Sequence, residues 1–169
     1  FGGCDFRCRW CDSMFAVQKK YETQWQNLSE NEVVEQVNKL SGSSLPLVNL
    51  TGGNPALFEL TSLISNLKTQ GYKVNVETQG SKKQSWFKDC DYVTLSPKPP
   101  SAGNYKHQLE ECIGAAGDAS IVLKIVIADR KDFNFALELS RKFKGTDLVL
   151  QPVNDSSQEQ PDCRPLFLE

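Results

Sequence analysis

The fold is decided by residues 47–78, which read LVNLTGGNPALFELTSLISNLKTQGYKVNVET. A short β-rich run at 47–50 is followed by a turn rich in glycine and proline. Residues 57–70 then repeat leucine and isoleucine at helical spacing and stop before Gly71, a typical helix-ending residue. A second β-rich run occupies 73–78. A strand, a helix and a strand in this order predict two parallel strands joined by a right-handed crossover.

The same alternation continues along the chain. Further β-rich runs occur at 92–95, 121–128 and 147–150, and further helical patterns at 29–40 and 132–143. The helix at 29–40 begins with a capping box, Ser29 with Glu32, and its expected apolar face is Val33, Val37 and Leu40. A complete eight-fold barrel needs about 250 residues. The 169 residues therefore predict an α/β fold, an incomplete (β/α) TIM-like barrel with a parallel sheet and reduced helices.

Composition restricts the class of protein. With 19 Lys and Arg against 21 Asp and Glu and 39% hydrophobic residues, the chain has the material for one domain and one core. A net charge of -2 disfavours direct binding to nucleic acid or to an anionic membrane. No apolar run approaches the roughly 20 residues that span a bilayer, and we expect a cytoplasmic protein. Because the chain starts at Phe1, we expect 1–169 to be a single core domain truncated at both ends.

Polar turns follow four of the predicted strands, at 51–55, 77–80, 96–100 and 151–152. In a (β/α) barrel the functional groups gather at the carboxyl ends of the strands, so these turns are expected to line one site. Glu77 and Gln79 share one strand face and are candidates for binding a substrate. Lys124 interrupts an apolar run, so it either pairs with an anionic group of the site or lies at an open edge.

A cysteine motif near the start of the chain carries the strongest chemical signal. Cys4, Cys8 and Cys11 form the pattern C-x3-C-x2-C, with Trp10 directly before the third cysteine. A structural zinc site needs four ligands, and no fourth is evident, because His107 is the only histidine and Cys90 is remote in the sequence. His107 itself is expected at the surface. Three thiolates suit a 4Fe-4S cluster with one open iron, although a zinc site completed by a remote residue stays an alternative. The isolated cysteines are expected to be ordinary small apolar residues: Cys90, Cys112 and Cys163.

The motif resembles that of the radical S-adenosylmethionine (SAM) superfamily, and the turn at 51–55 is similar to the Gly-Gly-Glu-Pro motif of those enzymes. The resemblance implies a barrel of the radical SAM type, whose cluster binds SAM and cleaves it to a 5′-deoxyadenosyl radical. The chemistry then belongs to the cofactor, while the protein positions the reactants and excludes water.

Further motifs at 11–13, 51–57, 77–80 and 95–101 resemble the 7-carboxy-7-deazaguanine synthases of queuosine biosynthesis, from Phe1 to about Gln151. The resemblance implies a lyase that converts 6-carboxy-5,6,7,8-tetrahydropterin into 7-carboxy-7-deazaguanine and ammonia and regenerates SAM. It also implies a homodimer and an electron donor such as flavodoxin.

The resemblance assigns roles to individual residues. The cluster ligands would be Cys4, Cys8 and Cys11, and Ser13 would bind Mg²⁺. SAM contacts would come from Trp10, Cys11, Asp12, Gly53, Asn54, Ser96, Pro97 and Lys98, and Thr51 would contact the substrate. Gly52 and Gly53 would bring bare backbone close to a ligand. Asn54 replaces the usual glutamate, and its amide oxygen is expected to accept from the SAM ammonium.

Other interpretations remain open from the sequence. A radical SAM activase, which creates a glycyl radical on a protein partner, shares the cysteine motif, but the additional motifs favour the synthase. A non-catalytic metal-binding module would use the cysteines structurally. For single residues, Trp10 could simply pack, and Ser13 could cap the loop after the cysteines.

Overall fold

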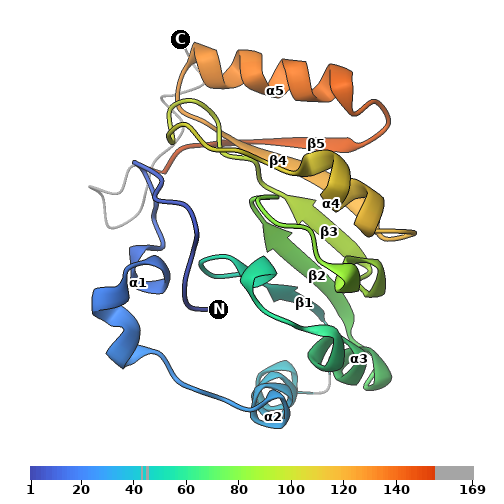
Figure 1. Ribbon diagram of the computed structural model, residues 1–169. Helices are drawn as coiled ribbons and strands as arrows, with labels where there is room; N and C mark the ends of the chain where they lie inside the picture. Colours follow the sequence, from blue (N-terminus) through green and yellow to red (C-terminus); the bar gives the residue numbers. More distant parts are fainter. Residues whose placement is uncertain (43, 45, 155–169) are drawn as a thin grey trace.

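The protein is described here by a computed structural model that covers residues 1–154 apart from 43 and 45. It centres on an open, five-stranded sheet (Figure 1). The strands lie side by side in chain order, and all neighbours are parallel. They are β1 (Leu47–Leu50), β2 (Lys73–Thr78), β3 (Tyr92–Leu95), β4 (Ser120–Ile127) and β5 (Asp147–Pro152). The predicted incomplete (β/α) barrel is therefore confirmed.

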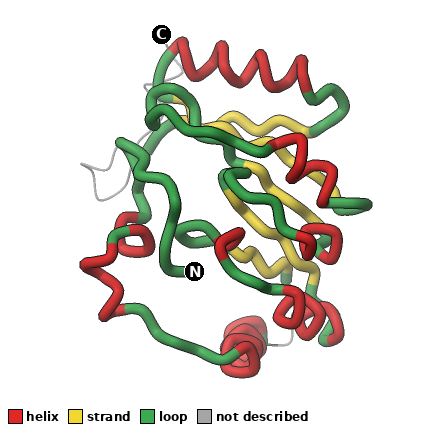
Figure 2. Tube along the Cα trace, in the orientation of Figure 1, coloured by secondary structure: helices red, strands yellow, loops and turns green. Residues whose placement is uncertain are grey.

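The helices separate into an outer layer and an N-terminal group. Figure 2 shows α3, α4 and α5 along one side of the strands, whereas the N-terminal segment and α1 lie across from the ends of the strands. In Figure 1 the arrowheads of β1, β2 and β3 point toward this N-terminal segment. The α-helices are α1 (Met14–Val17), α2 (Glu30–Ser41), α3 (Thr61–Thr69), α4 (Leu109–Ala115) and α5 (Arg130–Lys142). Three 3-10 helices complete the set: η1 (Lys19–Gln24), η2 (Pro55–Leu57) and η3 (Ser85–Asp89).

The main core lies between the sheet and the outer helices. Alternate residues of the strands point into it and are fully buried, among them Val76, Leu95 and Leu123. From α3, Leu63, Ile64 and Leu67 pack against them, as the helical spacing predicted. The start of α3 differs from the prediction: residues 55–57 form the separate helix η2, which the Asn54 side chain caps. Helix α3 therefore begins only at Thr61.

Helix α2 has the predicted capping box, and two residues of its predicted apolar face, Val33 and Val37, pack against the core. Ser29 N–H donates to the Glu32 carboxylate over 2.7 Å, and Glu32 N–H donates back to Ser29 Oγ. Val34 is the residue that the helix buries, whereas Leu40 is 86% exposed, so its predicted place in the core is wrong. Six residues separate Leu40 from Val34, which places them about 120° apart around the helix.

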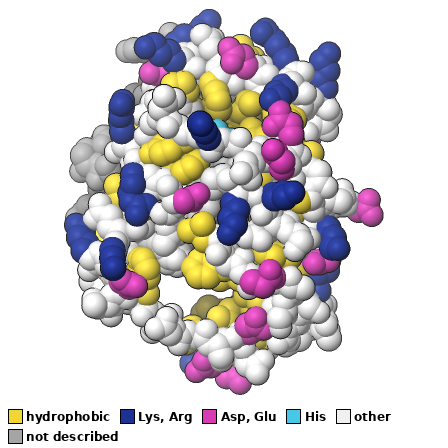
Figure 3. Space-filling view, viewed as in Figure 1, with side chains coloured by type: hydrophobic (Ala, Val, Ile, Leu, Met, Phe, Trp, Pro, Cys, Tyr) yellow, Lys and Arg dark blue, Asp and Glu magenta, His cyan; other side chains and the backbone are white. Residues whose placement is uncertain are grey.

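The other sequence expectations for the fold have mixed outcomes. Cys90 and Cys112 lie in the core as ordinary apolar residues, and Cys163 lies outside the described residues. None of the helices in the described residues has the length and apolar character that crossing a membrane requires. Figure 3 shows basic and acidic side chains interspersed over the viewed face, together with a hollow near α2. One surface pocket there is lined by Phe1, Trp25, Leu28, Val33 and Phe58, among others.

Candidate active site

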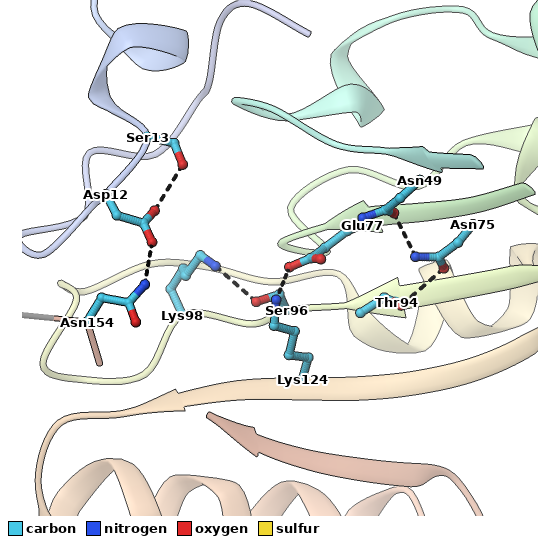
Figure 4. Close-up of polar contacts among 10 residues, drawn as sticks. All are labelled: Asp12, Ser13, Asn49, Asn75, Glu77, Thr94, Ser96, Lys98, Lys124 and Asn154. Carbon is cyan, nitrogen blue, oxygen red and sulfur yellow. Dashed lines mark hydrogen bonds and ion pairs between the residues drawn. The ribbon is translucent and has the colours of Figure 1, made fainter. Parts of the chain in front are cut away.

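The second face of the sheet is polar. Asn49 of β1, Asn75 of β2 and Thr94 of β3 form a side-chain ladder across it (Figure 4). Asn75 Nδ2 donates to Asn49 Oδ1 over 2.8 Å, and Thr94 Oγ1 donates to Asn75 Oδ1 over 3.1 Å. Because side chains alternate along a strand, these polar residues stand opposite the valines and leucines of the core. The inner face of the open barrel therefore presents polar groups that can contact a ligand.

An ion pair joins β2 and β4 on this polar face, next to the ladder (Figure 4). Lys124 Nζ lies 2.8 Å from Glu77 Oε1, and their side chains are 27% and 25% exposed. Of the two alternatives that the sequence left open for Lys124, the structure shows the pair with an anionic group, which is Glu77. Glu77 lines the pocket described next, and Lys124 supports it from the neighbouring part of the sheet.

A pocket lies where the carboxyl ends of the strands meet the cysteine loop. Its cavity volume is about 140 Å³, and it is partly open to solvent. The strand ends contribute Thr51, Gly52, Gly53, Glu77, Thr78, Gln79, Ser96 and Lys98. The N-terminal segment contributes Cys4, Phe6, Cys8, Cys11, Asp12, Ser13 and Val17. The structure thus brings together the cysteine motif and three of the four strand-end turns that the sequence singled out, without the turn at 151–152.

The cysteine loop is docked onto the loop that follows β3. Arg9 N–H donates to the Ala102 carbonyl over 2.9 Å, and the Phe6 ring stacks on Tyr105 with centroids 4.1 Å apart. Cys8 is buried in this second small core. Burial raises the pKa of the Cys4 and Cys8 thiols, so binding a metal there would release protons.

The N-terminal segment is also hydrogen-bonded to the Gly-Gly turn after β1. Gly53 N–H donates to the Phe1 carbonyl and Asn54 N–H to the Gly3 carbonyl, each over 2.8 Å. Gly52 has a φ of 134°, and a side chain at Gly52 or Gly53 would collide with the backbone of Phe1 or Gly3. These glycines therefore permit a close approach to the backbone of Phe1 and Gly3. Gly52 and Gly53 also line the pocket described above, so their expected approach to a ligand stays a prediction.

Asn54 departs from the expected role in SAM binding. Its side chain is fully buried and does not line the pocket. The amide oxygen accepts from Ala56 N–H and Thr78 Oγ1, and the amide nitrogen donates to Asp5 and Ser81. Every hydrogen-bonding position of the amide is used internally, so Asn54 ties the turn to β2 and to the cysteine loop.

Gln79 makes a further link from β2 to the cysteine loop. Its amide nitrogen donates to Asp5 Oδ1 over 2.6 Å and to Cys4 Sγ over 3.4 Å. Phe6 N–H also donates to Cys4 Sγ over 3.4 Å. Gln79 lies in the pocket wall as predicted, but its amide nitrogen faces the cysteines.

The Ser96-Pro97-Lys98 turn places a cation in the pocket wall. Ser96 and Pro97 are buried, and Lys98 Nζ donates to Ser96 Oγ over 3.0 Å. Burial lowers the pKa of the Lys98 ammonium, while the nearby Cys8 and Glu77 raise it. The turn therefore lies at the site, as the Pro-Lys-Pro-Pro pattern after a strand suggested.

His107 is not the surface residue that the sequence suggested. Its Nε2 accepts the backbone N–H of Lys98 over 2.9 Å. Burial, together with the Lys98 charge, lowers the pKa of His107 to about 4. The ring is thus neutral and serves as an acceptor that holds the Lys98 turn.

The residues after Cys11 meet the end of β5. Ser13 Oγ donates to Asp12 Oδ1 over 2.9 Å, and Asn154 Nδ2 donates to Asp12 Oδ2 over 3.0 Å (Figure 4). Ser13 makes no side-chain cap bond to α1. Trp10 is partly buried and packs against the small core without lining the pocket, and its indole N–H donates to Ser101 Oγ. Asn154 carried no sequence signal, and the motif at 95–101 did not indicate that Ser101 binds Trp10, because the partners in these two bonds lie 142 and 91 positions apart.

The donor set fits an iron-sulfur cluster. Three thiols line one pocket, and Cys4 Sγ accepts two N–H groups, which is the kind of bond that tunes cluster sulfurs. Within the described ranges, no three His, Cys, Asp or Glu side chains converge on a single metal ion. In a four-iron cluster each thiolate binds a different iron, so the ligands need not converge in that way.

Comparison with known proteins identifies relatives of the chain. No protein-family model matches the chain. The 7-carboxy-7-deazaguanine synthase of Bacillus cereus is 33% identical over 164 residues, which cover 95% of this chain and 69% of that protein. The Bacillus subtilis synthase is 32% identical over 169 residues, with the same coverage of 95% and 69%. The crystal structure of QueE from Escherichia coli superposes with a TM-score of 0.67 over 98% of this chain and 77% of that one, at 21% sequence identity.

Proposed function

The chain belongs to the 7-carboxy-7-deazaguanine synthase family, and from that premise we propose how its pocket performs the reaction. The family reaction converts 6-carboxy-5,6,7,8-tetrahydropterin into 7-carboxy-7-deazaguanine and ammonia, in the queuosine pathway. The chain is accordingly a radical SAM lyase. The main support for the site is that the three cysteines and the ends of β1, β2 and β3 line the same pocket.

Cys4, Cys8 and Cys11 hold the 4Fe-4S cluster in this proposal. A cluster held there would supply, together with bound SAM, the radical chemistry that starts the reaction at C6 of the pterin. The chain's own part is to place the three sulfurs and to limit solvent around them. Cys8 is buried, and the Phe6 and Tyr105 rings cover this side of the loop.

SAM is held by the Lys98 turn, Gly53 and the residues around Cys11. Lys98 is a cation whose hydrogen-bond partner is a neutral hydroxyl, Ser96 Oγ, which suits a carboxylate ligand such as that of the methionine moiety. Asp12 lines the same pocket and offers a carboxylate to hydroxyl or ammonium groups. Asn54 contributes indirectly, by fixing the turn, and Trp10 by packing.

The pterin is bound by Thr51 and Glu77, with Gln79 and Lys124 as supports. Lys124 occupies Glu77 Oε1 and keeps that carboxylate oriented, which leaves Oε2 for N–H groups of the substrate. Thr51 is exposed at the mouth of the pocket and can donate its hydroxyl.

Ser13 is proposed to ligate Mg²⁺ together with the substrate. Its hydroxyl is not used to cap α1, and it lies beside the Asp12 carboxylate at the pocket. Mg²⁺ prefers such hard oxygen donors and keeps positions for substrate oxygens and water. Titration of Mg²⁺ into wild type and Ser13→Ala tests this role, since equal activation of both would remove Ser13 as a ligand. The homodimer, the flavodoxin-type donor and the cytoplasmic location stay predictions of the sequence.

The whole assignment is tested by turnover under anaerobic conditions. The reconstituted protein is incubated with dithionite, SAM and carboxytetrahydropterin, and the product is identified by its mass. We expect 7-carboxy-7-deazaguanine with little net consumption of SAM. Cleavage of SAM without this product would favour an activase, and binding of zinc without any cleavage of SAM would favour a non-catalytic module.

A further inference from the structure

A chain of hydrogen bonds connects the cysteine loop to the start of α5. The Trp10 indole N–H donates to Ser101 Oγ over 2.8 Å, and the Ser101 hydroxyl donates to Asp132 Oδ2 over 2.5 Å. Trp10 belongs to the cysteine loop, Ser101 to the loop after β3, and Asp132 to the first turn of α5. We call this set of three side chains the Trp10–Ser101–Asp132 relay.

Asp132 is an unusual residue to find inside the protein. It is 0% exposed, and none of the ion pairs in the described residues includes it. Its carboxylate instead accepts the N–H of Ser101 over 3.0 Å and that of Ala128 over 2.9 Å, besides the Ser101 hydroxyl. A position in the first turn of a helix further favours a negative charge. A buried carboxylate is costly unless it is bonded in this way, and the Ser101 hydroxyl supplies one of these bonds.

The chemistry of the three groups fixes the direction of the relay. An ionised carboxylate can only accept, and an indole N–H can only donate. The Ser101 hydroxyl must therefore point its hydrogen at Asp132 and its free lone pair at Trp10. Asp132 thus determines which way Ser101 faces, and Ser101 determines where the Trp10 ring is held.

Trp10 directly precedes Cys11, in a stretch of turns between Arg9 and Ser13 without regular secondary structure. The backbone bond from Cys11 N–H to the Cys8 carbonyl is long, at 3.3 Å. We propose that Asp132 is a positioning residue of the cluster site, which acts through Ser101 and Trp10 to hold Cys11 in the pocket. The proposal rests on the proposed function, because it requires that this loop carries the cluster.

The test uses two readouts that need no turnover: the lifetime of the reconstituted cluster in air, and the Kd for SAM under anaerobic conditions. Asp132→Asn keeps the shape of the side chain but offers an amide that can donate to Ser101 and reverse the relay. We expect the cluster still to assemble, with a lifetime several-fold shorter and a Kd for SAM about fivefold to tenfold higher. Ser101→Ala, which removes the middle of the relay and leaves Asp132 two N–H donors, should produce the same shifts.

A double-mutant comparison separates positioning from general stability. Trp10→Phe keeps the ring but lacks the N–H, so in this background Asp132→Asn should change neither readout further. Leu139→Ala loosens α5 elsewhere in its buried face and should lower stability while leaving the Kd for SAM unchanged. Three results would each overturn the proposal. One is wild-type values of both readouts in Asp132→Asn and in Ser101→Ala. The others are fully additive effects of Asp132→Asn and Trp10→Phe, or an equal shift of the Kd for SAM in Leu139→Ala. A cluster retained in Cys8→Ala would overturn the proposed function instead.

Discussion

The two faces of the sheet are built from alternate residues of the same strands, yet they have different tasks. On β4, Leu123 is fully buried against the outer helices, and its neighbour Lys124 reaches Glu77 on the polar face. On β2, Val76 is likewise buried in the core, and its neighbour Glu77 lies on the polar face. The comparison teaches that a parallel strand need not be apolar on both faces when one face lines a barrel. Stability then depends mainly on one face, and chemistry on the other.

The cysteines follow the same division. Cys90 and Cys112 are buried on the helix side, where burial raises the pKa of both thiols to about 12 and keeps them protonated. Cys4, Cys8 and Cys11 lie at the opposite side, in the pocket wall. One residue type thus serves as an apolar filler in one region and as a proposed ligand in the other.

The largest expected effect comes from replacing cysteines by alanine in the pocket wall and comparing the result with the same replacement in the core. Cys4→Ala, Cys8→Ala and Cys11→Ala should each abolish the 4Fe-4S cluster, because each removes one of three protein ligands. Iron and sulfide content and the visible absorption of the reconstituted protein measure this. Cys90→Ala and Cys112→Ala are the matched controls and should keep a full cluster. Loss of the cluster in a control variant would break the division between the two sides.

The next effect concerns the apolar face alone. Leu123→Ala should lower the free energy of unfolding by about 2–5 kcal/mol, because it leaves a cavity in a core that the helices close. Denaturant unfolding monitored by circular dichroism gives this value. The Kd for SAM of the folded fraction should stay at the wild-type level. A changed Kd would mean that the two faces are coupled more tightly than their side chains suggest.

The neighbouring residue should show the opposite behaviour. Lys124→Met removes the partner of Glu77, so kcat/KM for the pterin should fall about tenfold to a hundredfold. The free energy of unfolding should fall by only about 1 kcal/mol or less, because both side chains are a quarter exposed. Lys124→Arg keeps the cation and should retain most of the activity. Unaltered kinetics in Lys124→Met would exclude Glu77 as an oriented substrate ligand.

The remaining prediction is a pH dependence that involves His107, which accepts the backbone N–H of Lys98. The pKa of His107 is about 4 in the folded chain and about 6.5 when unperturbed, so between these values the unfolded chain binds the additional proton. Stability should therefore decrease as the pH falls from about 6.5 to about 4. His107→Gln can still accept the Lys98 N–H and should lose this part of the dependence. Denaturant midpoints at pH 7 and pH 5 test it, and equal pH dependence in both proteins would contradict it.

The sheet could be predicted from the sequence because each strand corresponds to a short β-rich run of consecutive residues. The bounds of β1, β2 and β3 match the predicted runs, β4 is shifted by one residue, and β5 extends to Pro152. The helix α4 was not predicted, since it spans only seven residues and buries just Leu109 and Cys112. Such a short segment gives too few repeats for a helical period to stand out.

The site was predictable as a set of residues but not as a network. The cysteines and the strand-end turns could be found because spacing and position in a barrel are local properties. The roles of Asn54, His107 and Asp132 could not, because each depends on partners that come close only after folding. Asn54 is saturated by Asp5, Thr78 and Ser81 among others, and no rule of spacing predicts which polar group a buried amide will meet.

The N-terminal segment forms three hydrogen bonds with distant parts of the chain. Phe1 bonds to Thr51, 50 positions away, and Trp10 to Ser101, 91 positions away. Asp12 bonds to Asn154, 142 positions away. Contacts between such distant parts of a chain require large loops to close, and they are expected to form late during folding. The three cysteines are therefore expected to reach their places only on a sheet that has already formed. A cluster would then be inserted into a nearly folded protein, whereas an unfolded chain would present the three thiols without the pocket around them.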